Sequence, residues 1–131
     1  MQTLTASTVG KWTLVAFTAS MFAFNLWKAD AWDVIVLGVA FLPWLVGPAA
    51  IAAYLAKRAP NGWVAWAFVV VEIAVAASTI ALWSDLLLHP DAQNGIAMMF
   101  FPALQFAAVL VTGLLIKMAA VVFGTRSSSQ I

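Results

Sequence analysis

One carboxylate stands inside a long apolar run, which makes Glu72 the first residue to consider for chemistry. It lies between Trp63 and Trp83, and no other charged residue separates those two tryptophans. A carboxylate at the centre of a bilayer costs about 3 kcal/mol or more if it is ionised and unpaired. Glu72 is therefore expected to be protonated, hydrogen-bonded or turned toward polar groups. It could tie two helices together, contact another membrane protein, or act as a proton carrier or cation ligand.

Polar residues on two other apolar runs are spaced so that they could meet Glu72. On its own run, residues in steps of three and four share one helical face, and they are Ala65, Val69, Glu72, Ala76, Thr79 and Trp83. The last run has a similar stripe of Phe101, Gln105, Ala108 and Thr112, and the first run repeats Lys11, Thr18 and Asn25 every seven residues. We expect a buried intramembrane polar cluster of Glu72, Gln105 and Thr18.

The second apolar run contributes prolines at this level instead of polar side chains. Pro43 and the pair Gly47-Pro48 remove backbone donors and leave carbonyl groups unpaired, so the sequence predicts a helix break there. Broken helices form substrate sites in many transporters. They also allow an ordinary helix to bend around a partner, and this structural interpretation is favoured for Pro43 and Pro48.

Potential metal ligands follow Trp83 in the sequence. Asp85 and His89 are four residues apart and Asp91 comes next, so these side chains could bind a metal ion if the helix continues past Trp83. An ion pair at the helix end, closed by Pro90, is the favoured interpretation. No cofactor is expected, because a single histidine excludes bis-histidine haem within one chain and the absence of cysteine excludes thiolate sites.

The composition indicates a membrane protein. Of the 131 residues, 65% are hydrophobic and 8% are charged, whereas a soluble domain carries roughly 25% charged residues. Four apolar segments are near the ~20 residues that cross a bilayer, and they span residues 9–27, 32–56, 63–83 and 96–116 or to 123. The predicted fold is all-α, with one four-helix transmembrane domain over residues 1–124 and a disordered tail at 125–131.

The basic residues predict an orientation in a bacterial inner membrane. Five of the 6 lysines and arginines fall on one side of the four segments, the exception being Lys28, and the positive-inside rule makes that side cytoplasmic. Short connections favour an up-down-up-down bundle with both termini cytoplasmic. The first segment is expected to remain as a signal anchor instead of being cleaved at the small residues Ala29 and Ala31.

The sequence contains no recognisable catalytic set. It lacks a supported serine-histidine-aspartate arrangement, a glycine-rich phosphate loop and a HExxH metal pair, so enzyme activity is not expected. A net charge of +1 gives no reason to expect a nucleic-acid partner.

The leading functional prediction is therefore a small polytopic membrane protein, surrounded by lipid, that binds other membrane proteins or itself. It would act as an accessory or scaffold subunit or as an immunity-like blocker. The alternative is an oligomeric proton- or cation-coupled transporter or channel that uses Glu72. Four helices are too few to enclose a pathway, so the alternative requires an oligomer.

Overall fold

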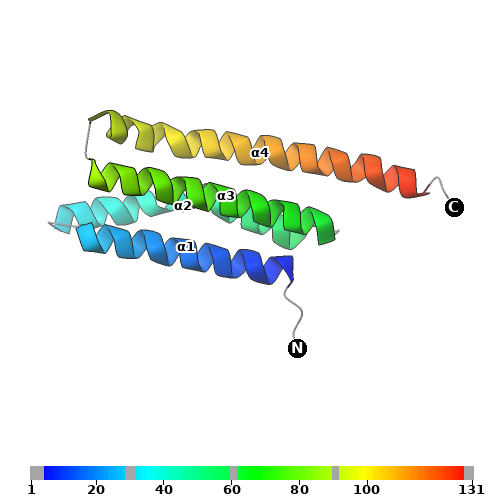
Figure 1. Cartoon of the computed structure of the whole chain (residues 1–131), viewed down its shortest axis with the longest axis horizontal. Coiled ribbons are helices and arrows are strands. Elements are labelled where there is room, and N and C mark those ends of the chain that lie inside the picture. Colours follow the sequence, from blue (N-terminus) through cyan, green and yellow to red (C-terminus); the bar gives the residue numbers. More distant parts are fainter. Residues whose placement is uncertain (1–4, 29–31, 60–61, 90–91, 129–131) are drawn as a thin grey trace.

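Four helices make up almost all of the structure, a computed structural model that describes residues 5–28, 32–59, 62–89 and 92–128. In chain order the helices are α1 (Ala6–Lys28), α2 (Trp32–Arg58), α3 (Gly62–Leu88) and α4 (Ala92–Ser128). The all-helical fold predicted from the sequence is confirmed. Figure 1 shows the four axes lying roughly side by side, with α4 extending beyond the others at its C-terminal end.

The helices are longer than the apolar runs that predicted them. α3 continues to Leu88 instead of ending near Trp83, and α4 begins at Ala92 and runs through Ser128. The predicted ends of the apolar runs were placed at tryptophans and charged residues, which favour the membrane interface. A helix can continue beyond such residues because its backbone hydrogen bonds are internal. Residues 125–128, expected to belong to a disordered tail, form the last turn of α4. Residues 129–131 lie outside the described part of the chain.

Three of the helices are long and apolar enough to cross a membrane. The qualifying segments within the described residues are Gly38–Arg58, Gly62–Leu86 and Met99–Gly124, and they indicate an integral membrane protein. The sequence predicted four such segments. α1 has the required length, at 23 residues, but it is not among the three, because threonines, serines and Lys11 dilute its apolar residues.

α2 and α3 form a central pair, with α1 on one side of it and α4 on the other. Both outer helices pack closely along α2 and α3, whereas the backbones of the described parts of α1 and α4 do not approach each other closely. α1 and α4 are therefore connected to each other mainly through the α2–α3 pair. A polar group on α1 and a polar group on α4 are separated by the central pair.

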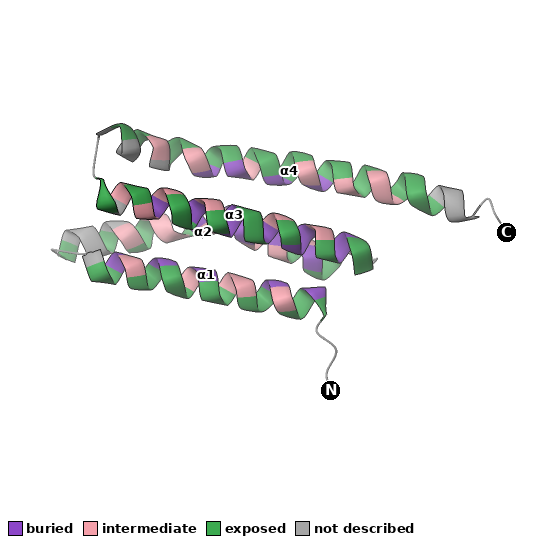
Figure 2. Cartoon of the chain, viewed as in Figure 1, coloured by how far each residue is buried: buried purple, intermediate pink, exposed green. Residues whose placement is uncertain are grey.

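Two buried clusters hold this arrangement together. One joins α1 to α2, α3 and α4 through Phe17, Met21, Leu45, Val75 and Val109. The other lies near the beginning of α3 and contains Ala6, Ala56, Val64, Ala65, Phe68 and Val69. Figure 2 shows that burial is concentrated on the facing sides of the helices, while much of α4 is exposed. In a membrane this exposed apolar surface can face lipid without penalty.

The two prolines of α2 lie inside one continuous helix. The helix is continuous from Trp32 to Arg58 and contains Pro43 and Pro48, where the sequence led us to expect a break. Gly47 has a packing role instead, because a methyl group at that position would lie 2.5 Å from Cζ of Phe106 on α4. The absence of a side chain at Gly47 thus lets the Phe106 ring lie against the α2 backbone.

Candidate functional site

The predicted face of α3 is buried. Its residues Ala65, Val69, Glu72, Ala76, Thr79 and Trp83 all fall in the buried class, and Glu72 has no exposed surface at all. The expectation that Glu72 lies inside the protein instead of facing lipid is therefore confirmed. Small residues on this face allow neighbouring helices to approach closely around the glutamate.

The carboxyl group of Glu72 lies against the backbone of α1 at Gly10. A methyl group at Gly10 would lie only 2.9 Å from Oε2 of Glu72, so the glycine leaves the space that the carboxyl group occupies. Within the described residues, neither carboxyl oxygen of Glu72 has a hydrogen-bond partner. Unpaired polar atoms are costly in an apolar interior. Nδ2 of Asn25 and Nε1 of Trp83 are also buried without a partner among the described residues, but Glu72 alone of these three is a carboxylic acid.

Gln105 binds a different part of α3. Its amide nitrogen lies 2.9 Å from the hydroxyl oxygen of Ser78, 2.9 Å from that of Thr79 and 3.2 Å from the carbonyl oxygen of Val75. The Thr79 hydroxyl in turn donates to the Val75 carbonyl at 2.9 Å. These contacts tie α4 to α3, where each interhelical hydrogen bond contributes about 0.6 to 2 kcal/mol.

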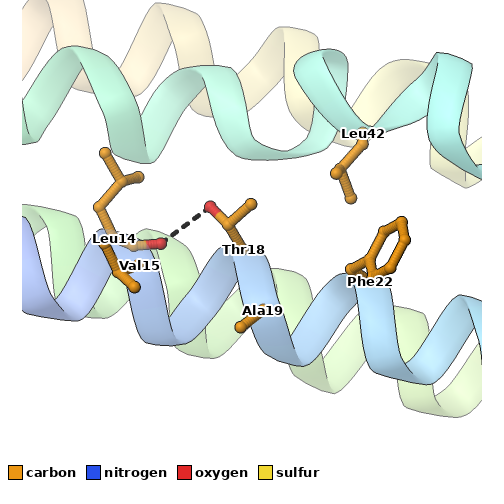
Figure 3. A pocket seen from close by; sticks show the side chains of 6 residues that line it. All are labelled: Leu14, Val15, Thr18, Ala19, Phe22 and Leu42. Carbon is orange, nitrogen blue, oxygen red and sulfur yellow. Dashed lines mark hydrogen bonds between the residues drawn. The ribbon is translucent and has the colours of Figure 1, made fainter.

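Thr18 makes its hydrogen bond within α1. Its hydroxyl donates to the carbonyl oxygen of Leu14, one turn earlier, at 2.8 Å. Figure 3 shows the side chain in a shallow apolar cavity of about 450 Å³ between α1 and α2, lined also by Phe22 and Leu42. Glu72 is not part of this cavity lining, and Thr18 is only half-buried.

The three residues of the predicted polar cluster therefore occupy three separate environments. Glu72 faces α1, Gln105 faces the hydroxyl groups of α3 from the α4 side, and Thr18 lies between α1 and α2. No hydrogen bond joins any two of them in the described part of the chain. Thr18 and Gln105 are kept apart because α1 and α4 lie on opposite sides of the α2–α3 pair. Glu72 does meet α1, but at Gly10, about two helical turns before Thr18.

The buried stripe of α4 differs from the predicted one. Pro102, Gln105, Val109 and Gly113 are buried, whereas Phe101 and Thr112 are half-buried and Ala108 is exposed. The helix is thus rotated by about one residue from the orientation that polar side chains suggested. Gly113 has no side chain, which lets Phe68 of α3 pack against the α4 backbone. A methyl group added at Gly113 would lie 3.4 Å from Cε1 of Phe68.

Glycine contacts are the feature that the sequence analysis missed. Gly10 lies opposite Glu72, and Gly38 of α2 lies opposite Asn25 of α1, where a methyl group would be 3.1 Å from Cγ of Asn25. Asn25 is also buried, and its Nδ2 has no partner among the described residues. Each glycine makes room for a polar side chain of a facing helix. The positions of these glycines on α1 and α2 could have indicated close helix contacts. The residue that each glycine contacts, however, depends on how far one helix is shifted along the other.

Asp85 and His89 come together at the end of α3. His89 Nδ1 lies 3.3 Å from Asp85 Oδ1, and the backbone N–H of His89 donates to the carbonyl oxygen of Asp85 at 2.8 Å. Both side chains are largely exposed. Within the described residues no group of three metal-ligating side chains is found, and the third predicted ligand, Asp91, lies outside them.

Among the buried polar residues that the structure describes, Glu72 is the ionisable one, and its carboxyl group lies beside the α1 backbone. Such a group can hold a proton or accept a hydrogen bond from something that enters the protein. A comparison with known protein families, curated proteins and solved structures found no match to this chain.

Proposed function

We propose that this chain is a multi-pass membrane protein that acts without catalysis, by binding helices of another membrane protein through the exposed face of α1. In this proposal all four helices cross a bacterial inner membrane alternately, with both termini in the cytoplasm. The distribution of lysine and arginine supports that orientation. The protein would serve as an accessory or scaffold subunit or as a blocker of its partner.

The surface of α1 is the observation that carries the proposal. Ala16 is followed three and four residues later by Ala19 and Ser20, Ala23 lies four and three residues after those two, and all four residues are exposed. Small residues on one helical face let a second helix approach closely, which is how helices associate in lipid. α1 also falls outside the set of helices that are apolar enough to cross a membrane by themselves. A helix with both properties gains more from packing against protein than from facing lipid.

α4 provides the contrast within the same chain. Its exposed side carries many large aliphatic residues, among them Leu104, Leu110, Val111, Leu114 and Leu115, together with the small residues Ala103, Ala107 and Ala108. It is also one of the helices that are apolar enough to cross a membrane. Surfaces of this type are well solvated by lipid tails, which are as apolar as leucine. The partner is therefore proposed to bind at α1, with α4 facing the bilayer.

Bulky substitutions on α1 test this proposal. Ala16→Leu combined with Ser20→Leu would fill the small-residue face, and we expect the partner to be lost when the protein is purified in mild detergent. The matched control is Ala103→Leu with Ala107→Leu, since both residues are exposed and four apart on α4. The control should retain the partner. Equal recovery of the partner with both variants would refute binding through α1.

A second function, proton- or cation-coupled transport, is favoured by the unpartnered carboxyl group of Glu72. Transport would require several copies of the chain, since four helices are too few to enclose a pathway. Reconstitution of Glu72→Gln in liposomes tests it, because that variant keeps the shape of the side chain but cannot carry a proton. Flux that depends on pH and disappears in this variant, with assembly intact, would establish transport. Unchanged flux would exclude a coupling role for Glu72.

A further inference from the structure

A cavity between the end of α2, the beginning of α3 and the later part of α4 combines an apolar interior with two cations. It has a volume of about 300 Å³ and is lined by Leu55, Val64, Phe68 and Ala120 together with Arg58 and Lys117. The two basic residues come from different helices, since Arg58 ends α2 and Lys117 belongs to α4. The cavity volume is at the lower end of the range for small-ligand pockets.

Both cations belong to the cavity lining and have side chains that can orient their charge toward a ligand. The guanidinium carbon of Arg58 lies 5.5 Å from the centre of the Tyr54 ring, one helical turn earlier. This cation–π contact favours one orientation of the guanidinium group. Lys117 has a long flexible stem that can run along apolar surface and bring its ammonium group to the interface. Both residues are exposed, so both side chains remain accessible to a ligand.

None of the described residues that line this cavity is acidic. The 5 acidic residues are Asp30, Asp33, Glu72, Asp85 and Asp91, which belong to the stretches 30–33 and 85–91 and to the middle of α3. In the described residues, no ion pair involves Arg58 or Lys117. In the part of the chain that the structure describes, the positive charge beside the cavity is therefore not neutralised by an acidic side chain.

We propose that this cavity binds an anionic phospholipid, with the phosphate between Arg58 and Lys117 and part of one acyl chain against Phe68 and Val64. Basic pockets between transmembrane helices at the membrane surface are suited to such headgroups. An apolar floor beneath two cations matches the chemistry of a phospholipid, which joins an anion directly to a hydrocarbon chain. A soluble phosphate could bind the two cations but would make no contact with the apolar residues of the cavity.

Lipid binding to the purified full-length protein tests the proposal, with retention of lipid measured by native mass spectrometry. Phosphatidylglycerol and phosphatidylcholine with identical acyl chains serve as probes. We expect phosphatidylglycerol to bind at least tenfold more tightly. Each cation near a membrane surface contributes a factor of about five to binding of an anion, so Arg58→Gln with Lys117→Gln should weaken phosphatidylglycerol binding by about 25-fold.

Lys57→Gln is the matched control. This residue is adjacent to Arg58, exposed and equally charged, but it does not line the cavity. We expect it to weaken phosphatidylglycerol binding less than twofold. Ala120→Phe, which fills the cavity without changing charge, should weaken binding of both lipids. Helicity measured by circular dichroism verifies that each variant is folded.

Three results would overturn the proposal. The first is equal affinity for the two lipids, and the second is a loss with Lys57→Gln as large as with the double variant, which would indicate unspecific surface attraction. The third is full competition by inorganic phosphate, which would indicate a free-anion site. None of these results depends on the partner proposed for α1, so the lipid site and the partner interaction can fail separately.

Discussion

Replacement of Gly10 by alanine probes the position of Glu72 most closely. The added methyl group would lie 2.9 Å from Glu72 Oε2, well inside the ~3.5 Å at which non-bonded atoms make their best contact. Overpacking of this kind costs about 1 to 3 kcal/mol. The same substitution favours the helix by about 0.5 to 1 kcal/mol. We therefore expect a net loss of about 1 kcal/mol in the free energy of unfolding.

Gly124→Ala is the matched control for this substitution. Gly124 is also helical, but nothing lies within 4 Å of an added methyl group there. Only the helix-propensity effect remains, so Gly124→Ala should stabilise the protein by up to about 1 kcal/mol. Opposite signs at the two glycines would show that the cost at Gly10 comes from its neighbour and not from the helix itself.

A double-mutant cycle then identifies that neighbour. In a Glu72→Ala background the carboxyl group is gone, and Gly10→Ala should become neutral or stabilising. The coupling between the two sites is expected to be about 1 to 3 kcal/mol, typical of residues in contact. Unfolding can be followed by tryptophan fluorescence as denaturing detergent is added to protein in mild detergent. If Gly10→Ala stabilises the protein equally with Glu72 and with Ala at position 72, the proposed contact is refuted.

Three further substitutions test other parts of the structure. Gln105→Leu removes the contacts of α4 with the hydroxyl groups of α3 and should lower the unfolding free energy by about 1 to 2 kcal/mol, as measured in the same detergent titration. Gly47→Ala brings a methyl group to 2.5 Å from Phe106 and should destabilise the protein by about 1 to 3 kcal/mol, a loss that Phe106→Ala should relieve. Asp85→Asn removes a largely exposed pair with His89 and should leave the unfolding midpoint almost unchanged, because exposed ion pairs contribute little.

The sequence was most informative about α3. Its buried face could be predicted because small residues and a single glutamate repeat at helical spacing in an otherwise uniform apolar run. The face of α4 was less predictable, because Pro102 and Gly113 pack by their shape and not by polarity. For α2, prolines suggested a break, yet one continuous helix contains both of them.

The neighbours of Glu72 could not be predicted from the sequence. Which residue of α1 lies beside it depends on the axial shift between two helices that are not consecutive in the chain. That shift is set by the packing of Phe17, Met21 and Val75 in the shared core. A periodic pattern gives the face of each helix but not its height relative to another helix. Gly10 could therefore be recognised as the partner only once the helices were assembled.

A native mass measurement of the solubilised protein tests the central claim most directly, namely that this chain works by binding another membrane protein. The protein should be extracted from its own membrane in mild detergent and its mass recorded without crosslinking. We predict a complex of fixed composition, larger than the 14.0 kDa chain, that contains a second membrane protein and is lost in Ala16→Leu with Ser20→Leu. Recovery of the native protein only as a lone monomer would contradict the proposed function.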